Sequence, residues 1–239
     1  MDCKEVAVAT MTWARDAAEE RLLRESLPLL SGLGAHVFVT DGGSGASLLE
    51  FIRGLPNFHL TEAGAAGVWR QARVSIEAAA EASARFVLYT EPDKRDFFRE
   101  GLRGFVGEAP GDEDVGVVLA SRSAESFATF PQFQRQTETT INRCCAEVLG
   151  VEADFTYGPF LLNRALLPHL RGAPDSIGWG WRPYAFGTAR RLGYRIQHVD
   201  AHLPCPPEQR GEGAAERLYR IRQLGQNIEG LLGPLTHGA

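Results

Sequence analysis

Short apolar runs alternate along the chain with segments whose apolar residues repeat at helical spacing. The run Val6–Met11 is followed by Leu23, Leu27 and Leu30, which would lie on one face of a helix. Asp16 precedes that segment in a sequence that resembles a helix-opening capping signal. The chain is therefore predicted to begin with a strand and a helix that ends before the next glycines.

The same alternation continues through the rest of the sequence. Further strands are predicted at His36–Thr40, Phe58–Leu60, Phe86–Thr90, Val115–Ala120, Gly158–Asn163 and Tyr194–Val199. Further helices are predicted around Leu48–Ile52, from about Val68 to Ala82, around Phe97 and Phe98, over Gln132–Leu149 and Trp181–Leu192, and in a final segment carrying Leu218, Ile221, Ile228 and Leu232. Strands this apolar leave no face for water, so the order predicts the α/β class, with a mostly parallel central sheet flanked by helices.

The organisation of the chain follows from its length and composition. With 239 residues, 44% of them hydrophobic and 23% charged, the sequence is typical of one folded globular domain. It contains no internal repeat or linker that would divide it. We expect a single Rossmann-like domain over residues 1–239, with a first half at about 6–110, a second half at about 111–203, and a C-terminal loop and helix at 204–239.

The charge and the cysteine content of the sequence limit the binding partners and the cellular location that we expect for the protein. A net charge of −5 gives no electrostatic reason to bind a polyanion, so we expect no nucleic-acid partner. No run approaches the ~20 apolar residues of a membrane span, and the first residues do not resemble a secretory signal. Both features predict a cytoplasmic protein without a transmembrane segment. Four unbridged thiols are expected at Cys3, Cys144, Cys145 and Cys205, whose spacing fits no zinc site.

Polar residues stand near the ends of three predicted strands. Thr10 lies near the end of the first, Asp41 follows the second, and Glu91 and Asp93 follow Phe86–Thr90. Ligands of parallel α/β sheets bind at the carboxyl ends of the strands, so we expect these side chains at one crevice. Simpler alternatives stay open, because an Asp before Gly-Gly is a frequent turn former and Asp93 could cap the next helix.

Several motifs follow one another in a characteristic order. An Asp-Gly-Gly-Ser turn follows the second strand, an Ala-Arg pair lies on a helix, two acids end a further strand, and a Gly-Trp-Gly-Trp sequence comes late. The segments concerned are Val39–Ser44, Gly67, Ala72-Arg73, Phe86–Asp93, Tyr157–Arg164 and Ile177–Trp181. In this order the chain, from about Val6 to Val199, resembles the nucleotide-sugar glycosyltransferases of the GT-A fold, and among them family 2.

The resemblance implies a hexosyltransferase-like enzyme whose donor is a nucleotide diphosphate sugar, bound by the first half of the domain. A divalent cation, Mn²⁺ or Mg²⁺, would neutralise the diphosphate, held by Glu91, Asp93 and a late histidine, here His202. His202 has the alternative of a surface loop residue, and a Glu stands where the family usually has the first Asp. The other residues of the implied nucleotide pocket are Thr10, Asp41, Gly42 and Arg73, the last with the alternative of an ordinary ion-paired helix residue.

On the acceptor side, the resemblance assigns Trp179, Trp181 and Tyr184 to a stacking wall, with a packed aromatic cluster as the alternative. Inverting members continue this segment with Glu-Asp, whose Asp is the general base, but here Arg182 and a proline follow. Asp175 is the nearest acid that could serve instead, unless it only forms a turn. A retaining enzyme similar to mannosylglycerate synthase needs no such base, and Arg182 would then suit an anionic acceptor. The candidate catalytic residues are thus Asp175 and Arg182.

Two other functions are compatible with the motifs. A degenerate GT-A domain would bind a nucleotide or a glycan without catalysis, as the altered acidic motif and the missing Glu-Asp allow. A nucleotidyltransferase would share the architecture, but its Gly- and Arg-rich loop after the first strand is poorly matched by Thr12–Arg15. The expected partners are a nucleotide diphosphate sugar and a small-molecule or glycan acceptor, and the sequence sets no oligomeric state.

Overall fold

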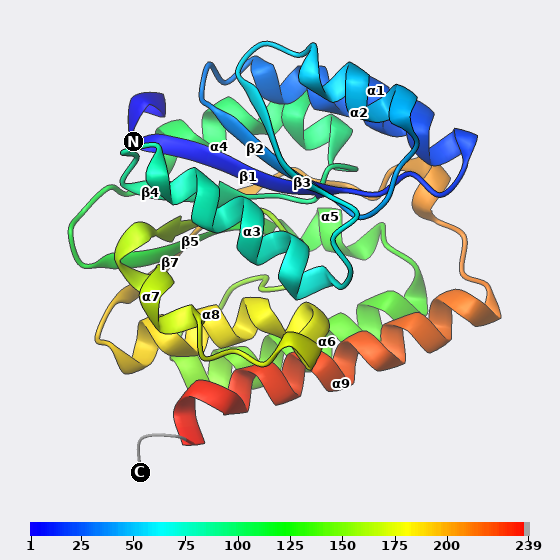
Figure 1. Ribbon diagram of the computed structural model, residues 1–239. Coiled ribbons are helices and arrows are strands. Elements are labelled where there is room, and N and C mark those ends of the chain that lie inside the picture. The colour runs from blue at the N-terminus through cyan, green and yellow to red at the C-terminus, as the bar shows by residue number, and fades with distance from the viewer. Residues whose placement is uncertain (237–239) are drawn as a thin grey trace. The chain divides into compact units, whose positions relative to one another are not determined.

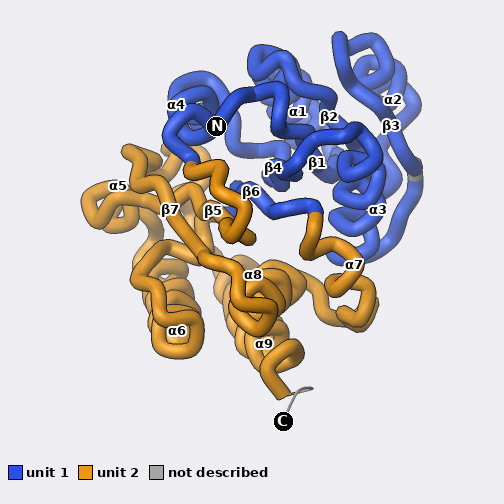
Figure 2. The backbone as a smooth tube through the Cα atoms, turned by 90° about the vertical axis from the view of Figure 1, so that its left-hand side faces the viewer, with its two compact units in different colours: residues 1–109, 158–164 blue, residues 110–157, 165–239 orange. Residues whose placement is uncertain are grey.

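The computed structural model describes residues 1–236. The chain divides into two compact units, which Figure 2 shows in different colours. Unit 1 consists of Met1–Ala109 and Gly158–Arg164, and unit 2 of Pro110–Tyr157 and the chain from Ala165 onward. The expectation of a single domain stays a prediction.

Unit 1 is built on strands in the order β3-β2-β1-β4-β6. Their bounds are β1 (Val6–Thr12), β2 (Val37–Asp41), β3 (Phe58–Ala63), β4 (Phe86–Tyr89) and β6 (Phe160–Asn163). The pairs β2–β3, β1–β2 and β1–β4 are parallel, whereas β6 runs antiparallel to β4. The carboxyl ends of β1, β2 and β4 and the amino end of β6 therefore share one edge of the sheet, the edge at which ligands of such sheets bind.

Helices cover both faces of these strands. In Figure 1, α1 and α2 lie on one side of β1–β3 and α3 lies on the other. Their bounds are α1 (Ala17–Ser31), α2 (Ala46–Arg53) and α3 (Val68–Glu81), and a π-helix at Phe97–Gly101 leads into α4 (Leu102–Glu108). The Asp16 carboxylate caps α1 as predicted, accepting hydrogen bonds from the backbone N–H groups of Ala18 and Glu19 at 2.9 and 2.8 Å.

Unit 2 contains β5 (Val115–Arg122), whose every residue is buried, paired in parallel with β7 (Arg195–Ala201). Its helices are α5 (Ala124–Ala128), α6 (Gln132–Leu149), α7 (Leu167–Leu170), α8 (Trp181–Arg191) and α9 (Ala214–Thr236), together with the 3-10 helix η4 (Asp175–Gly180). The long helix α9 packs against α6, α8 and η4. Figure 1 shows it in orange to red along the same side of the unit as α6 and α8.

The predicted α/β class with mostly parallel strands is confirmed, and α6 has the predicted bounds. The sequence pattern missed α5 and the short 3-10 helices Cys3–Glu5, Arg164–Leu166, Asp175–Gly180 and Pro207–Gln209, because such short elements show too little periodicity. All four cysteines are free, as predicted. Within residues 1–236, no helix is both long and apolar enough to span a membrane.

Candidate functional site

The Asp41 carboxylate holds together the loops that follow β1 and β2. Oδ1 accepts hydrogen bonds from the backbone N–H groups of Gly43 and Ser44 at 2.8 and 2.7 Å. Oδ2 accepts from the hydroxyls of Thr12 and Ser44 at 2.8 and 2.6 Å. A carboxylate offers about four lone-pair sites, so these four bonds use its capacity. Because Asp41 is also fully buried, its contacts support the turn-forming alternative over direct contact with a nucleotide.

Thr10 is likewise engaged within unit 1. Its buried hydroxyl donates a 2.8 Å hydrogen bond to the carbonyl oxygen of Thr90, the residue that follows β4. The bond fixes the end of β4 just before Glu91. Thr10 therefore shapes the strand end that carries the acids, and its hydroxyl proton is committed to Thr90.

Glu91 and Asp93 follow β4 at the edge where the strand ends meet, and both are partly exposed. Gly158, just before β6, lies against Glu91 so closely that a Cβ atom there would overlap the Glu91 carboxylate. Gly158 also has a φ of 126°, which side chains other than that of glycine rarely adopt. Glycine at position 158 is thus what leaves room for the Glu91 carboxylate.

The chemistry of this pair fits a hard divalent cation, which prefers carboxylate oxygens. Lys94 Nζ lies 3.9 Å from Asp93 Oδ1, so the lysine would compete with a metal ion for the Asp93 carboxylate. Within residues 1–236, His, Cys, Asp and Glu side chains form no group of three or more placed to hold a metal ion. The third predicted ligand, His202, belongs to unit 2, where its Nδ1 lies 3.4 Å from the Ser126 hydroxyl. Its role as a ligand stays a prediction.

Two residues beside Gly42 were missed by sequence reasoning. A Cβ atom on Gly42 would lie 3.0 Å from Nε2 of Gln71 and 3.1 Å from Cβ of Trp13, so both line the Gly42 turn. Trp13 is 54% exposed, although it is the most apolar side chain of the loop after β1. In the sequence, the position of Trp13 directly after the carboxyl end of β1 could have marked it as a candidate site residue. Arg73, two residues after Gln71 on α3, has its Cζ 5.9 Å from the ring of Trp69, and its predicted role stays open.

In unit 2, the aromatic residues near η4 differ in exposure. Trp181 is 1% exposed, which favours the packed alternative for this ring, whereas Trp179 and Tyr184 are partly exposed. Arg182 is 3% exposed, with its Cζ 5.1 Å from the ring centroid of Trp179. Asp175 is exposed in the first turn of η4. The assignments of these residues to catalysis and to the acceptor stay predictions.

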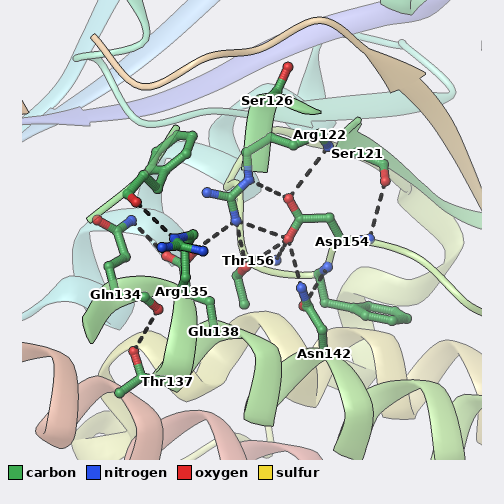
Figure 3. A network of polar contacts seen from close by, with 12 residues as sticks. Ser121, Arg122, Ser126, Gln134, Arg135, Thr137, Glu138, Asn142, Asp154 and Thr156 are labelled. Atoms are coloured by element: carbon green, nitrogen blue, oxygen red, sulfur yellow. Dashed lines mark hydrogen bonds and ion pairs between the residues drawn. The ribbon is translucent and has the colours of Figure 1, made fainter. Parts of the chain in front are cut away.

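A buried ion-pair network at the end of β5 was not foreseen (Figure 3). The Arg122 guanidinium donates to Asp154 through Nε at 2.5 Å and through Nη2 at 3.1 Å. Nη2 also donates to Glu138 at 2.7 Å and to the Thr156 hydroxyl at 2.9 Å. The ring centroids of two aromatic residues lie 4.3 and 4.7 Å from the guanidinium carbon. Arg220 of α9 lies 3.7 Å from Glu138, so two cations balance two anions.

The electrostatics of this network follow from its burial. Burial alone would raise the pKa of Asp154, but the Arg122 charge and the hydrogen bonds from Arg122, Thr156 and Asn142 lower it to about 2. Burial disfavours the charged form of Arg122, but Glu138 and Asp154 together raise its pKa. Asp154 and Arg122 are therefore both charged at neutral pH, and the network ties β5, α6 and the loop that contains Asp154 to one another.

Solved structures with the same architecture identify the fold. The chain matches glucosyl-3-phosphoglycerate synthase from Mycobacterium tuberculosis in complex with UDP with a TM-score of 0.66 and 18% identity, over 97% of this chain and 80% of that one. The complex of that enzyme with phosphoglyceric acid matches with a TM-score of 0.64 and 18% identity, over 96% and 79%. The chain has the fold of this enzyme. The predicted GT-A fold is thereby confirmed.

A third structure of the same enzyme, in complex with Mn²⁺, UDP-glucose and phosphoglyceric acid, matches with a TM-score of 0.60 and 18% identity, over 97% of this chain and 79% of that one. No family model and no curated protein matches the sequence. At this level of identity the likeness establishes the fold, and the activity has to be argued from the residues.

Proposed function

We propose that the protein is a glycosyltransferase that moves a sugar from a nucleotide diphosphate sugar to an acceptor carrying an anionic group, with a divalent cation on the diphosphate. The observation that carries the proposal is the pair Glu91 and Asp93 at the carboxyl end of β4, with Gly158 leaving room for Glu91. The structures with the same fold support it, since they were solved with UDP or UDP-glucose, Mn²⁺ or Mg²⁺, and phosphoglyceric acid.

The reaction explains why two carboxylates belong at this strand end. Transfer breaks the bond between the anomeric carbon of the sugar and a diphosphate oxygen, and forms a bond to an acceptor oxygen. The nucleoside diphosphate leaves with additional negative charge, which a divalent cation neutralises when bound. Glu91 and Asp93 supply hard oxygen ligands for that cation. His202 is the proposed third ligand.

The nucleotide is proposed to bind at the loop that Asp41 holds in shape. Trp13 presents a half-exposed indole on this loop, and a flat aromatic face suits the ring of a nucleobase. Gln71 and the backbone of Gly42 add polar groups next to it. In this arrangement Asp41 acts indirectly, by fixing the loop through its four hydrogen bonds, and Arg73 is proposed to contact the nucleotide or one of the acids.

The acceptor is proposed to bind in unit 2. Arg182 is proposed to attract a carboxylate or phosphate of the acceptor through its charge, and its guanidinium, in a side chain that is only 3% exposed, lies over the ring of Trp179. Trp179 and Tyr184 are the aromatic residues with exposed surface to offer. Asp175 is the proposed general base of an inverting reaction, because it is exposed at the start of η4.

A second function is favoured by two observations. All four lone-pair sites of Asp41 are used within the protein, and Trp181 is buried, so we propose structural roles for both positions under this second function. A domain that binds a nucleotide or glycan without transferring a sugar would retain these structural roles. A cytoplasmic location is proposed for either function, supported by the four free thiols.

Ligand-dependent stability tests the donor site. The thermal midpoint is measured against UDP-, GDP-, ADP- and TDP-sugars with and without Mn²⁺, because a ligand at ~100 times its dissociation constant stabilises by about 2.7 kcal/mol. We expect a Mn²⁺-dependent shift with one nucleotide family, and its loss in the variant Glu91→Ala with Asp93→Ala.

The matched control removes two other acids from unit 1. Glu81→Ala with Glu100→Ala changes the net charge equally, and both residues are exposed. This control should keep the shift. A shift that survives in the Glu91 and Asp93 variant would remove these residues from the site, and the absence of any shift with wild-type protein would contradict the proposed donor site.

A further inference from the structure

The helix η4 has an unusual backbone at its centre. Gly178 has φ 55° and ψ −133°, so the chain leaves helical geometry between Ile177 and Trp179. Such a conformation is open to glycine and strained for other residues. Helix α9 packs against this segment.

That support comes from the middle of α9. The Gln226 side-chain oxygen accepts a 3.2 Å hydrogen bond from the backbone N–H of Trp179. A Cβ atom on Gly178 would overlap the Gln226 side chain, and one on Gly180 would overlap the Gln226 carbonyl group. A Cβ atom on Gly230 would overlap the carbonyl oxygen of Gly180. Three glycines therefore let the backbones of η4 and α9 touch, and Gln226 fills the space that they leave.

Helix α9 is itself anchored on both sides of Gln226. Before it, Arg220 forms an ion pair with Glu138 of α6 at 3.7 Å, with both side chains largely buried. After it, a Cβ atom on Gly187 of α8 would lie 2.7 Å from Cγ of Pro234, so the two helices are in close contact there. Gln226 thus reaches η4 from a helix that contacts α6 before it and α8 after it.

We propose that Gln226 is a positioning residue for the acceptor site. It fixes the backbone of Trp179, and with it the indole that lies against the Arg182 guanidinium. This inference rests on the proposed function, which assigns Trp179 and Arg182 to the acceptor. Gln226 lies on the last helix of the chain, outside every motif of the sequence. We expect its replacement to impair use of the acceptor and to leave donor binding unchanged.

The test compares three variants of similar side-chain size on one helix. Gln226→Leu keeps the shape and removes the hydrogen bond, whereas Gln226→Glu keeps an oxygen that accepts from the Trp179 N–H. Gln223→Leu is the matched control, because Gln223 lies one turn away on α9 and its side chain accepts from Arg220. Two readouts are measured for each: the hydrogen exchange rate of the Trp179 amide, and kcat and KM for the donor and for phosphoglyceric acid.

We expect Gln226→Leu to speed exchange of the Trp179 amide and to lower kcat/KM for the acceptor about tenfold, the equivalent of ~1.4 kcal/mol for one lost hydrogen bond. The donor KM should stay within about twofold, and Gln226→Glu and Gln223→Leu should behave like wild type. Unchanged exchange in Gln226→Leu, or equal losses for donor and acceptor, would overturn the proposal. If wild type transfers no sugar, the proposed function fails, and faster exchange in Gln226→Leu alone would still establish the contact while removing its role at an acceptor.

Discussion

Replacing Asp154 by Asn removes one charge from the buried network without changing the shape of the side chain. Asp154 bonds the Arg122 guanidinium at 2.5 and 3.1 Å, and both side chains are more than nine-tenths buried. The variant leaves Arg122 with Glu138 as its remaining buried acid. Breaking a buried ion pair by removing one partner costs about 3–5 kcal/mol. Because Glu138 and the asparagine oxygen still accept from Arg122, we expect a loss near 3 kcal/mol.

The lowered pKa of Asp154 gives a second magnitude for the same contact. The pKa of Asp154 is lowered from 3.8 to about 2, and each unit corresponds to ~1.4 kcal/mol, so the charged carboxylate stabilises the fold by roughly 2 kcal/mol. A group whose pKa is lowered by folding contributes fully above its unfolded value and loses the contribution as pH falls. The stability difference between wild type and Asp154→Asn should therefore be largest near pH 7 and shrink between pH 4 and 2.

Urea unfolding followed by circular dichroism, at several pH values from 7 to 2, measures this difference. Asp114→Asn is the control, because Asp114 bonds Arg195 at 2.5 Å in an exposed pair and should cost much less. A loss below about 1 kcal/mol for Asp154→Asn at pH 7 would contradict the burial argument. A difference that does not change with pH would contradict the assigned cause of the pKa shift.

Three further variants test the site itself. Gly158→Ala should abolish the Mn²⁺-dependent stabilisation by a nucleotide sugar, since its Cβ would displace Glu91, whereas Gly193→Ala, also at positive φ but with open space around its Cβ, should keep it. Trp13→Ala should weaken nucleotide binding in calorimetry by about 1–3 kcal/mol, the typical contribution of base stacking, and unchanged affinity would exclude the indole from the site. Asp175→Asn should lower kcat by about 100-fold or more with an unchanged donor KM, and an unchanged kcat would exclude Asp175 as the general base.

The sequence predicted those features that depend on local pattern. Apolar runs located the strands, leucine spacing located α1, and Asp16 marked its start, because each signal lies within a few residues of the element that it describes. The strand-end rule also located Glu91 and Asp93 at the edge of the sheet where β1, β2 and β4 end.

What the sequence could not predict depends on contacts between distant segments. The saturation of Asp41 requires Thr12, which reaches it only because β1 and β2 pair in register. The meeting of Gly158 and Glu91 requires the antiparallel pairing of β6 with β4. Arg122 and Gln226 carried no motif at all, since their partners lie 16 to 47 residues away.

Transfer of a sugar releases a nucleoside diphosphate, and measuring this release is the decisive test of the proposed function. Purified protein is incubated with UDP-glucose, Mn²⁺ and phosphoglyceric acid, the ligands of a structure with the same fold, and UDP and the glycosylated product are quantified. We expect acceptor-dependent release of UDP by wild type and by the Glu81→Ala, Glu100→Ala control, and none by the Glu91→Ala, Asp93→Ala variant. Release that is equal in all three proteins would contradict the assigned site. Each nucleotide sugar that binds is also tested with carboxylate and phosphate acceptors. If none of these combinations releases the nucleoside diphosphate, the protein is not a transferase, and the alternative of a binding domain without catalysis is favoured.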